Sequence, residues 1–352
     1  IDADNWWPYQ REAIGAIIRA FSDGYRVVVL SAPTGSGKTI IAAATAKLLD
    51  QRSLTMVHTL ALQDQYRKTA SWAEIGKGKR NFPCGQATEP GREWLRKKLG
   101  RKGLLNTEDC DEYLDCAAPD VCSYFQALGR AARADHVIFN YAFAARITIP
   151  DVLVRGILTR RERQEPDEDT TPPPNPFRGD MRPLAILDEC HLSNDAIVSA
   201  FMLDFWHGTF DRLGLIPPQS NDAADWKAWA PHALKGLESF TLPDDTVLVR
   251  RVTALKGRIR QLAHIDPADW IVTREPTVTH IQPIWARCVY HTLARNLLRA
   301  YPRVILMSGT PGDPSLLAHK LGFEEGECCV VSVPSSFPLQ NRPVFYWPVV
   351  RL

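Results

Sequence analysis

The sequence has no apolar run long enough to cross a membrane, because such a span needs about 20 consecutive apolar residues. Its first residues, Ile1-Asp2-Ala3-Asp4, have neither the basic nor the apolar region of a secretory signal. The sequence also lacks internal repeats, and its net charge of +2 is too small to indicate a class of partner. We therefore expect an intracellular globular protein with no membrane partner.

Paired C-x2-C knuckles are also absent, although the chain has eight cysteines. A disulfide framework is not expected in an intracellular protein. Four cysteines are grouped with the spacing C-x25-C-x5-C-x5-C, namely Cys84, Cys110, Cys116 and Cys122. Four thiolates can hold an iron–sulfur cluster or one zinc ion, or they can be ordinary reduced thiols. The missing knuckles and the wide spacing favour the cluster over zinc. The other four, Cys190, Cys288, Cys328 and Cys329, are scattered, and we expect small buried apolar side chains there.

Apolar residues make up 45% of the chain and charged residues 23%, as in soluble globular proteins. At 352 residues the chain is too long for one ordinary core, so we expect two or three subdomains. Short apolar strands alternate with segments of helical spacing, which indicates an α/β fold with a parallel sheet. The predicted strands are 27–30, 54–58, 136–140, 184–187, 304–307, 330–333 and 344–347, and the predicted helices are 5–21, 40–49, 60–66, 124–134 and 316–321. Residues 192–299 show no clear strand alternation and predict a mainly helical insert.

A phosphate-binding loop follows the first predicted strand. Residues 31–39 read Ser-Ala-Pro-Thr-Gly-Ser-Gly-Lys-Thr and lead into a helical run, which is the strand–loop–helix context that such a loop needs. Backbone N–H groups and the helix dipole hold phosphate oxygens there. We expect Lys38 to reach the β- and γ-phosphates and the Thr39 hydroxyl to bind Mg²⁺. The predicted nucleotide-binding residues are Pro33, Thr34, Gly35, Ser36, Gly37, Lys38 and Thr39.

Two carboxylates end a later buried strand, in the stretch Ala-Ile-Leu-Asp-Glu-Cys-His over residues 185–191. Asp188 is expected to hold the Mg²⁺ ion, and Glu189 to orient and deprotonate the attacking water. Together with the phosphate loop, this pair predicts an NTP-hydrolysing motor.

The order of these motifs resembles that of superfamily 2 helicases. Residues 32–39 are similar to motif I, and 58–65 (His-Thr-Leu-Ala-Leu-Gln-Asp-Gln) to motif Ia. Asp188-Glu189-Cys190-His191 resembles the Asp-Glu-Ala-His box with Cys in place of Ala, and Ser308-Gly309-Thr310 resembles motif III. The grouped cysteines fall between motifs Ia and II, and the helical insert between II and III. This layout resembles the XPD/DinG family of iron–sulfur DNA helicases, as does the stretch 122–141 that follows the last grouped cysteine.

The resemblance implies a RecA-like P-loop NTPase domain with a parallel sheet, a small iron–sulfur insert and a mainly helical, Arch-like insert. The implied division is 1–75, first part of the motor domain; 76–129, [4Fe-4S] cluster insert; 130–196, second part of the motor domain with a mobile loop at 160–180; 197–300, helical insert; and 301–352, last part of the motor domain and start of a linker. The implied activity is ATP-dependent unwinding of single-stranded or forked DNA with 5′-to-3′ polarity. A second motor domain is expected as a partner, because the sequence after Thr310 has no arginine-finger motif.

The resemblance also assigns roles to single residues. His191 and the turn formed by Ser308, Gly309 and Thr310 would couple nucleotide state to the DNA groove. Gln10 would contact the adenine, or it is an ordinary helix-surface residue. Gln63 and Gln65 would lie near the bound strand. Tyr124, Phe125 and Tyr141 either stack on bases or, as we expect, pack in the core.

The segment 77–102 contains nine Lys or Arg residues and two Glu, and it includes Lys97 and Lys98. It is either a solvated face or a contact to a phosphate backbone, and the neighbouring motifs favour the contact. The alternatives to a DNA helicase are a translocase ATPase acting on duplex DNA or RNA, and a nucleic-acid-binding module without activity of its own. A cytoplasmic, nucleoid-associated location follows for a bacterial or phage protein, and a nuclear one for a eukaryotic protein.

Overall fold

The computed structural model of the chain describes residues 6–82, 122–147, 182–238, 246–291, 298–299 and 301–334. Several predictions lie outside these residues, namely those for Cys84, Lys97, Lys98, Cys110, Cys116, the loop 160–180, the strand 344–347 and the linker.

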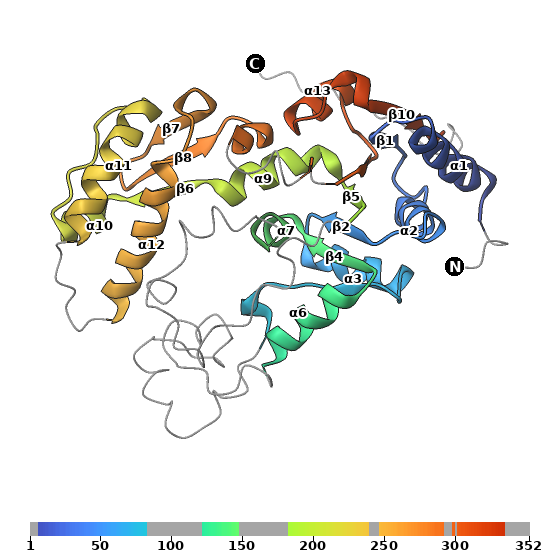
Figure 1. Cartoon of the computed structure of the whole chain (residues 1–352), viewed down its shortest axis with the longest axis horizontal. Coiled ribbons are helices and arrows are strands. Elements are labelled where there is room, and N and C mark those ends of the chain that lie inside the picture. Colours follow the sequence, from blue (N-terminus) through green and yellow to red (C-terminus); the bar gives the residue numbers. More distant parts are fainter. Residues whose placement is uncertain are drawn as a thin grey trace, which may run out of the picture.

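A seven-stranded, fully parallel sheet forms the centre of the part of the molecule outside the helical insert (Figure 1). Its strand order is β10-β1-β9-β5-β2-β4-β3. The strands are β1 (Val27–Ser31), β2 (Ser53–Val57), β3 (Glu74–Ile75), β4 (His136–Asn140), β5 (Leu184–Asp188), β9 (Arg303–Ser308) and β10 (Cys328–Ser332). The six longer strands confirm the predicted ones, and the short edge strand β3 was not predicted. Strands such as β1 are continuous apolar runs because helices cover both faces of the sheet.

Each face of the sheet has its own apolar core, since successive strand residues point to opposite sides. Val28 and Leu30 of β1 pack with α1 (Pro8–Ser22), α2 (Lys38–Leu48) and α3 (Leu60–Thr69). Val27 and Val29 belong to the opposite core, which includes α6 (Ser123–Arg133), α7 (Tyr141–Ile147), α9 (Ser193–Phe201) and α13 (Pro314–Lys320). Because this second core continues into the insert, the two regions are packed together rather than merely linked.

The insert follows α9 and lies at the opposite end of the molecule from α1 and α2 (Figure 1). It contains the helices α10 (His207–Leu213), α11 (Ala223–Glu238) and α12 (Thr246–Leu262), so the mainly helical prediction holds. The insert also contains three strands that the sequence pattern did not predict. β6 (Leu203–Trp206), β7 (Trp270–Arg274) and β8 (Val278–Pro283) form an antiparallel sheet in the order β6-β8-β7. The apolar pattern did not predict these strands because they are short and β6 and β7 each bury only one face.

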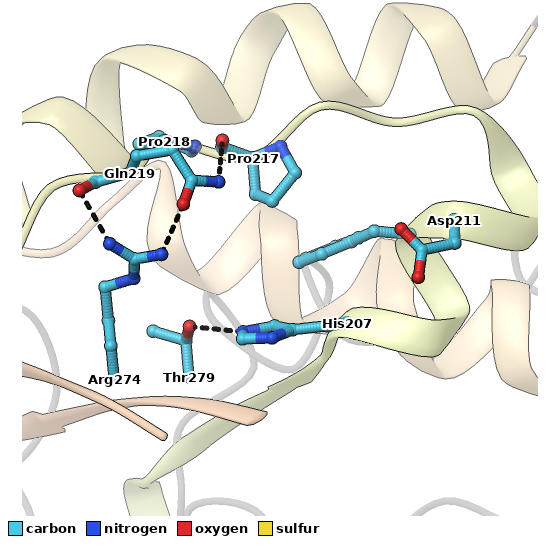
Figure 2. A pocket seen from close by; sticks show the side chains of 8 residues that line it. His207, Asp211, Pro217, Pro218, Gln219, Arg274 and Thr279 are labelled. Atoms are coloured by element: carbon cyan, nitrogen blue, oxygen red, sulfur yellow. Dashed lines mark hydrogen bonds between the residues drawn. The ribbon is translucent and has the colours of Figure 1, made fainter. Parts of the chain in front are cut away.

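A cavity of about 190 Å³ lies between this small sheet and α10 (Figure 2). Arg274 donates hydrogen bonds to the backbone and side-chain oxygens of Gln219 on one wall, and His207 contacts Thr279 Oγ1 at 3.0 Å on the floor. None of the predicted site residues lines this cavity. In the described part of the chain, no helix has the length and apolar character needed to span a membrane.

Candidate active site

Three predicted motifs meet at one edge of the parallel sheet. The phosphate loop follows β1, the Asp188–Glu189 pair ends β5, and the Ser308-Gly309-Thr310 turn follows β9. These strands are neighbours in the order β1-β9-β5, and in parallel strands all carboxyl ends lie on the same side. Segments far apart in the sequence therefore form one site where open α/β sheets bind ligands.

The phosphate loop has the backbone that close approach to an anion requires. Gly35 and Gly37 have φ values of 84° and 77°, in the left-handed region that favours glycine. Lys38 is the first residue of α2, so the positive end of the helix dipole faces the loop. The Ser36 hydroxyl is buried and has no hydrogen-bond partner in the structure. These features fit a bound phosphate group.

Gln10 lies against this loop. Its Nε2 donates to the Ser36 carbonyl at 3.0 Å, and its Oε1 accepts from Trp7 N at 3.1 Å. The Tyr9 hydroxyl donates to the same carbonyl at 3.2 Å. Gln10 is buried, so it is not an ordinary helix-surface residue. It holds the N-terminal helix to the phosphate loop, and its contact with adenine remains a prediction.

The predicted catalytic side chains are close together. Lys38 Nζ lies 3.7 Å from Glu189 Oε1 and donates to the Ala32 carbonyl at 3.3 Å. Glu189 has a left-handed backbone with φ 49° and ψ 50°, which is costly for a residue other than glycine and is found where structure imposes it. Its N–H donates to Asp188 Oδ1 at 3.0 Å. The sharp turn between the two carboxylates thus gives them different directions and different environments.

Asp188 is only 5% exposed. Burial raises the pKa of this carboxyl above its ordinary value, and the neighbouring Glu189 charge raises it further. The Tyr66 hydroxyl, the hydrogen bond from Glu189 N and the Lys38 charge act in the opposite direction. A buried carboxylate of this kind is stabilised by a cation, which suits Asp188 to hold a divalent metal ion together with Thr39.

A hydrogen bond connects this pair to the third motif. His191 Nδ1 lies 2.8 Å from Ser308 Oγ, which also accepts from Thr310 N at 3.0 Å. The same His191 nitrogen lies 3.5 Å from Glu189 Oε2. The Ser308 carbonyl in turn accepts from Ala32 N at 2.9 Å. A continuous set of contacts therefore runs from the phosphate loop through the third motif to the catalytic carboxylate.

Two tyrosines beside Asp188 were not given roles in the catalytic site from the sequence. Tyr141 begins α7 directly after β4, and its hydroxyl donates to the Asp188 carbonyl at 2.8 Å. Tyr66 of α3 is buried, and both Asp188 and Thr39 influence the pKa of its hydroxyl. The position of Tyr141 at the carboxyl end of a strand was a usable signal. Tyr66 follows Gln63 at helical spacing, and that spacing indicates only that both face inward.

The nucleic-acid predictions have mixed outcomes. The assignment of Gln63 to a bound strand was wrong, because its side chain is fully buried and its Nε2 donates to the Gly76 and Ile138 carbonyls at 3.0 and 3.2 Å. Gln65 is exposed on the same helix, so its role remains a prediction. Tyr124 and Tyr141 are buried in the apolar core and Phe125 packs against it, which confirms core packing.

Of the four grouped cysteines, the structure describes Cys122, which precedes α6. Within the described ranges, no three His, Cys, Asp or Glu side chains are grouped in a way that would hold a metal ion. The iron–sulfur cluster remains a prediction that rests on the sequence. Cys190 and Cys288 are buried as expected, and burial raises the pKa of the Cys190 thiol to about 12, whereas Cys328 and Cys329 are half-buried.

A known protein family matches the part of the chain that contains this site. The family described as Type III restriction enzyme, res subunit, matches residues 4–208, which include the phosphate loop, Asp188 and Glu189. The chain belongs to this family. No curated protein matches it.

The fold is similar to that of solved XPD helicases. A structure named XPD helicase has a TM-score of 0.51 and 13% identity, over 93% of this chain and 62% of that one. Xpd4 of S. tokodaii has a TM-score of 0.45 and 13% identity, over 94% and 61%. A truncated XPD has a TM-score of 0.46 and 14% identity, over 93% and 99%. The chain spans about three fifths of the length of the untruncated XPD helicases that it matches. Family and fold together make it a helicase-type ATPase domain.

Proposed function

We propose that the chain hydrolyses ATP to drive movement along single-stranded DNA and to unwind a fork, as the first motor domain of a helicase of the XPD/DinG type. The observation that carries this proposal is the convergence of three motifs on neighbouring strands, with Lys38 Nζ 3.7 Å from Glu189 and His191 2.8 Å from Ser308. The similarity in fold to XPD helicases supports the assignment.

Each side chain of the site has a separate task in this proposal. The phosphate loop holds the phosphates, and Lys38 neutralises the charge that builds up on the β- and γ-oxygens. Thr39 and Asp188 hold the Mg²⁺ ion, which supplies further charge neutralisation when it is bound. Glu189 orients the attacking water and accepts its proton. In the structure Glu189 lies beside Lys38, so the base and the phosphate-binding cation stabilise each other before nucleotide binds.

The third motif transmits the outcome of hydrolysis. Because His191 contacts both Glu189 and Ser308, a shift of the carboxylate reaches the turn after β9 through one side chain. Gly309 of that turn lies against the phosphate loop, where an added Cβ would be 3.5 Å from Thr34 N. Nucleotide state is therefore sensed from two sides of the turn, as coupling to a DNA groove requires.

The proposal includes a [4Fe-4S] cluster held by Cys84, Cys110, Cys116 and Cys122. Its role is to stabilise a small basic insert beside the DNA path, where Lys97, Lys98 and Gln65 contact the strand. Protein purified without oxygen should absorb broadly near about 400 nm and contain about four irons per chain. A colourless protein with one zinc ion per chain would replace the cluster by a zinc site. A second motor domain would supply arginine fingers to the ATP site.

The deciding experiment compares ATP turnover by the wild-type chain and Glu189→Gln, with the partner motor domain present. Glu189→Gln keeps the size of the side chain but removes the base, so turnover should fall by about 10²- to 10³-fold while nucleotide binding is retained. Stimulation by single-stranded DNA should exceed stimulation by duplex or RNA. Equal turnover by the two proteins would leave only a binding module.

The family match favours a second candidate, a translocase ATPase that acts on duplex DNA, because the family is named for a restriction enzyme subunit. The same assay separates the two candidates. Stronger stimulation by duplex than by single strands, without strand separation, would favour the translocase.

A further inference from the structure

A cavity of about 490 Å³ lies at the edge of the parallel sheet where the strands begin. Its walls come from residues just before or at the start of β1, β2, β5 and β9, and from the end of α1 and the turn after it. The walls include Phe21, Tyr25, Arg26, Gln51, Pro302 and Arg303. The nucleotide site lies at the opposite edge, where the strands end, and the strands separate the two by roughly 15 Å because each residue adds about 3.3 Å. The cavity is therefore separate from the nucleotide site.

Two arginines border this cavity, but the charge of Arg26 is compensated within the chain. Its guanidinium donates hydrogen bonds to the backbone carbonyls of Arg299 and Tyr301. Its Nη1 also lies 3.6 Å from Glu327 Oε1. Arg26 thus forms part of the wall and offers little to a ligand.

The guanidinium of Arg303 has no such partners. Its central carbon lies 5.6 Å from the centre of the Phe21 ring, so the ring supports one side of the group by a cation–π contact. Within the ranges that the structure describes, no carboxylate or carbonyl pairs with this side chain. The planar fork of an arginine matches the two oxygens of a carboxylate. Arg303 is therefore a half-buried cation whose donors are available to an anionic group in the cavity.

Two more side chains of the wall also lack partners. Gln51 Oε1 is buried and has no hydrogen-bond partner in the structure. Leaving such an oxygen unpaired is costly, and because a terminal amide turns readily about its last bond, the N–H of a bound peptide would satisfy it. Tyr25 is 40% exposed, and with Pro302 it adds apolar surface to the rim. Tyrosine and arginine are the residue types that protein interfaces favour.

We propose that this cavity docks a partner protein through an aspartate or glutamate side chain that pairs with Arg303. The backbone of the docked segment would bond to Gln51, and its apolar part would pack on Tyr25. A nucleic-acid strand fits less well, because its phosphates need several cations along the strand and Arg303 is the uncompensated cation of this wall. The inference does not depend on the proposed function, since the cavity shares no lining residue with the nucleotide site.

The experiment selects phage-displayed random short peptides on the whole chain, after removal of those that bind Arg303→Gln. The remaining peptides should carry Asp or Glu. Changing that residue to Asn or Gln in the synthetic peptide should weaken binding to wild type by about tenfold or more, measured by fluorescence anisotropy.

Two variants complete the comparison. Tyr25→Ala should weaken binding of the same peptide, and because Tyr25 is exposed, this variant keeps the test valid if Arg303→Gln melts much lower than wild type. Arg212→Gln, at an exposed position of α10 in the insert, is the matched control and should bind the peptide as wild type does. Tm shows that each variant is folded.

Each outcome decides the proposal. It is overturned if no peptide is specific to wild type, if the specific peptides lack acidic residues, or if Arg303→Gln and Arg212→Gln bind the peptide equally. Labelled single-stranded DNA should bind wild type and Arg303→Gln alike, and a tenfold loss confined to Arg303→Gln would assign the cavity to nucleic acid instead. Failure of wild type to bind DNA counts against the proposed function, whereas the peptide result still decides this inference.

Discussion

The region around the parallel sheet and the insert differ in whether their buried polar side-chain atoms have hydrogen-bond partners. In the parallel sheet region, the hydroxyl of Ser36 is buried without a hydrogen-bond partner, and Glu189 has a left-handed backbone. In the described part of the insert, from β6 to β8, no buried side-chain nitrogen or oxygen lacks a partner. Of the unsatisfied atoms in the parallel sheet region, the Ser36 hydroxyl lies in the proposed phosphate loop, whereas Gln51 Oε1 and Gln63 Oε1 lie elsewhere. The phosphate loop thus has a polar group that a bound phosphate would satisfy, whereas the described part of the insert has no group of this kind.

The polar face of the small sheet illustrates this completeness. His280 of β8 lies between two carboxylates, 2.7 Å from Asp204 Oδ1 and 3.7 Å from Glu275 Oε1. Behind this face, Phe205 stacks on Trp226 with ring centres 5.6 Å apart. Such pairs stabilise a fold without any ligand, so changes in the two regions should have separable effects.

The largest expected effect is that of Lys38→Ala on ATP turnover. Loss of the charge that stabilises the transferred phosphoryl group should reduce turnover by about 10³-fold, while Tm should change little. Lys235→Ala, at an exposed position of α11 in the insert, is the matched control and should stay within about twofold of wild type. A coupled ATPase assay checks both, and equal losses would contradict the separation of the two regions.

The reverse test is Trp226→Ala in the insert. Trp226 is fully buried, stacks on Phe205 and donates to the Ser220 carbonyl at 2.9 Å. Its removal should lower the free energy of unfolding by about 3–5 kcal/mol, measured by denaturant titration, with nucleotide affinity kept within about twofold. Trp206→Ala, at a side chain that is 52% exposed, should cost much less. A loss of nucleotide binding in Trp226→Ala would mean that a packing defect in the insert disturbs the nucleotide site through the core that the two regions share.

Two glycines with positive φ, Gly37 in the phosphate loop and Gly214 in the insert, allow the effect of backbone strain to be compared between the two regions. Gly37 and Gly214 both have positive φ, so alanine strains both. At Gly37 the added Cβ would also collide with Gln10 Nε2, whereas at Gly214 nothing lies within 4 Å. Gly37→Ala should weaken nucleotide binding by about tenfold, equivalent to about 1.4 kcal/mol. Gly214→Ala should leave binding unchanged, and similar binding curves for both variants would contradict the proposed shape of the loop.

The smallest expected effect is on pH dependence. Burial, with help from Lys47 and Arg182, lowers the pKa of His136 at the start of β4 from 6.5 to about 4. The unfolded chain therefore binds more protons between these values, so stability is lost as pH falls from 6.5 towards 4. His136→Gln should reduce the drop in Tm between about pH 7 and pH 5. His264→Gln, at an exposed position of the insert, should retain the full drop.

The sequence predicted the parallel sheet well because its strands are continuous apolar runs, such as Val-Val-Val-Leu in β1, that carry their own signal. The glycines and the paired carboxylates also marked the motifs that the structure brings together on neighbouring strands, and the roles of these residues remain predictions. It failed at Gln63, whose amide donates to the carbonyls of two segments, Gly76 and Ile138, and no local pattern predicts such a bond. It could not predict the unsatisfied hydroxyl of Ser36 either, because a missing partner is visible only when all neighbours are known.

The pairing of β9 with both β1 and β5 has a consequence for synthesis. The strand that carries the phosphate loop leaves the ribosome long before β9, the strand that joins it to the Asp188–Glu189 strand. Until residue 308 emerges, the phosphate loop on β1 and the carboxylates on β5 are separated by the empty position of β9. The apolar edges of β1 and β5 that pair with β9 are then unpaired. A chain whose translation stops inside the insert therefore exposes apolar strand edges and lacks the complete nucleotide site.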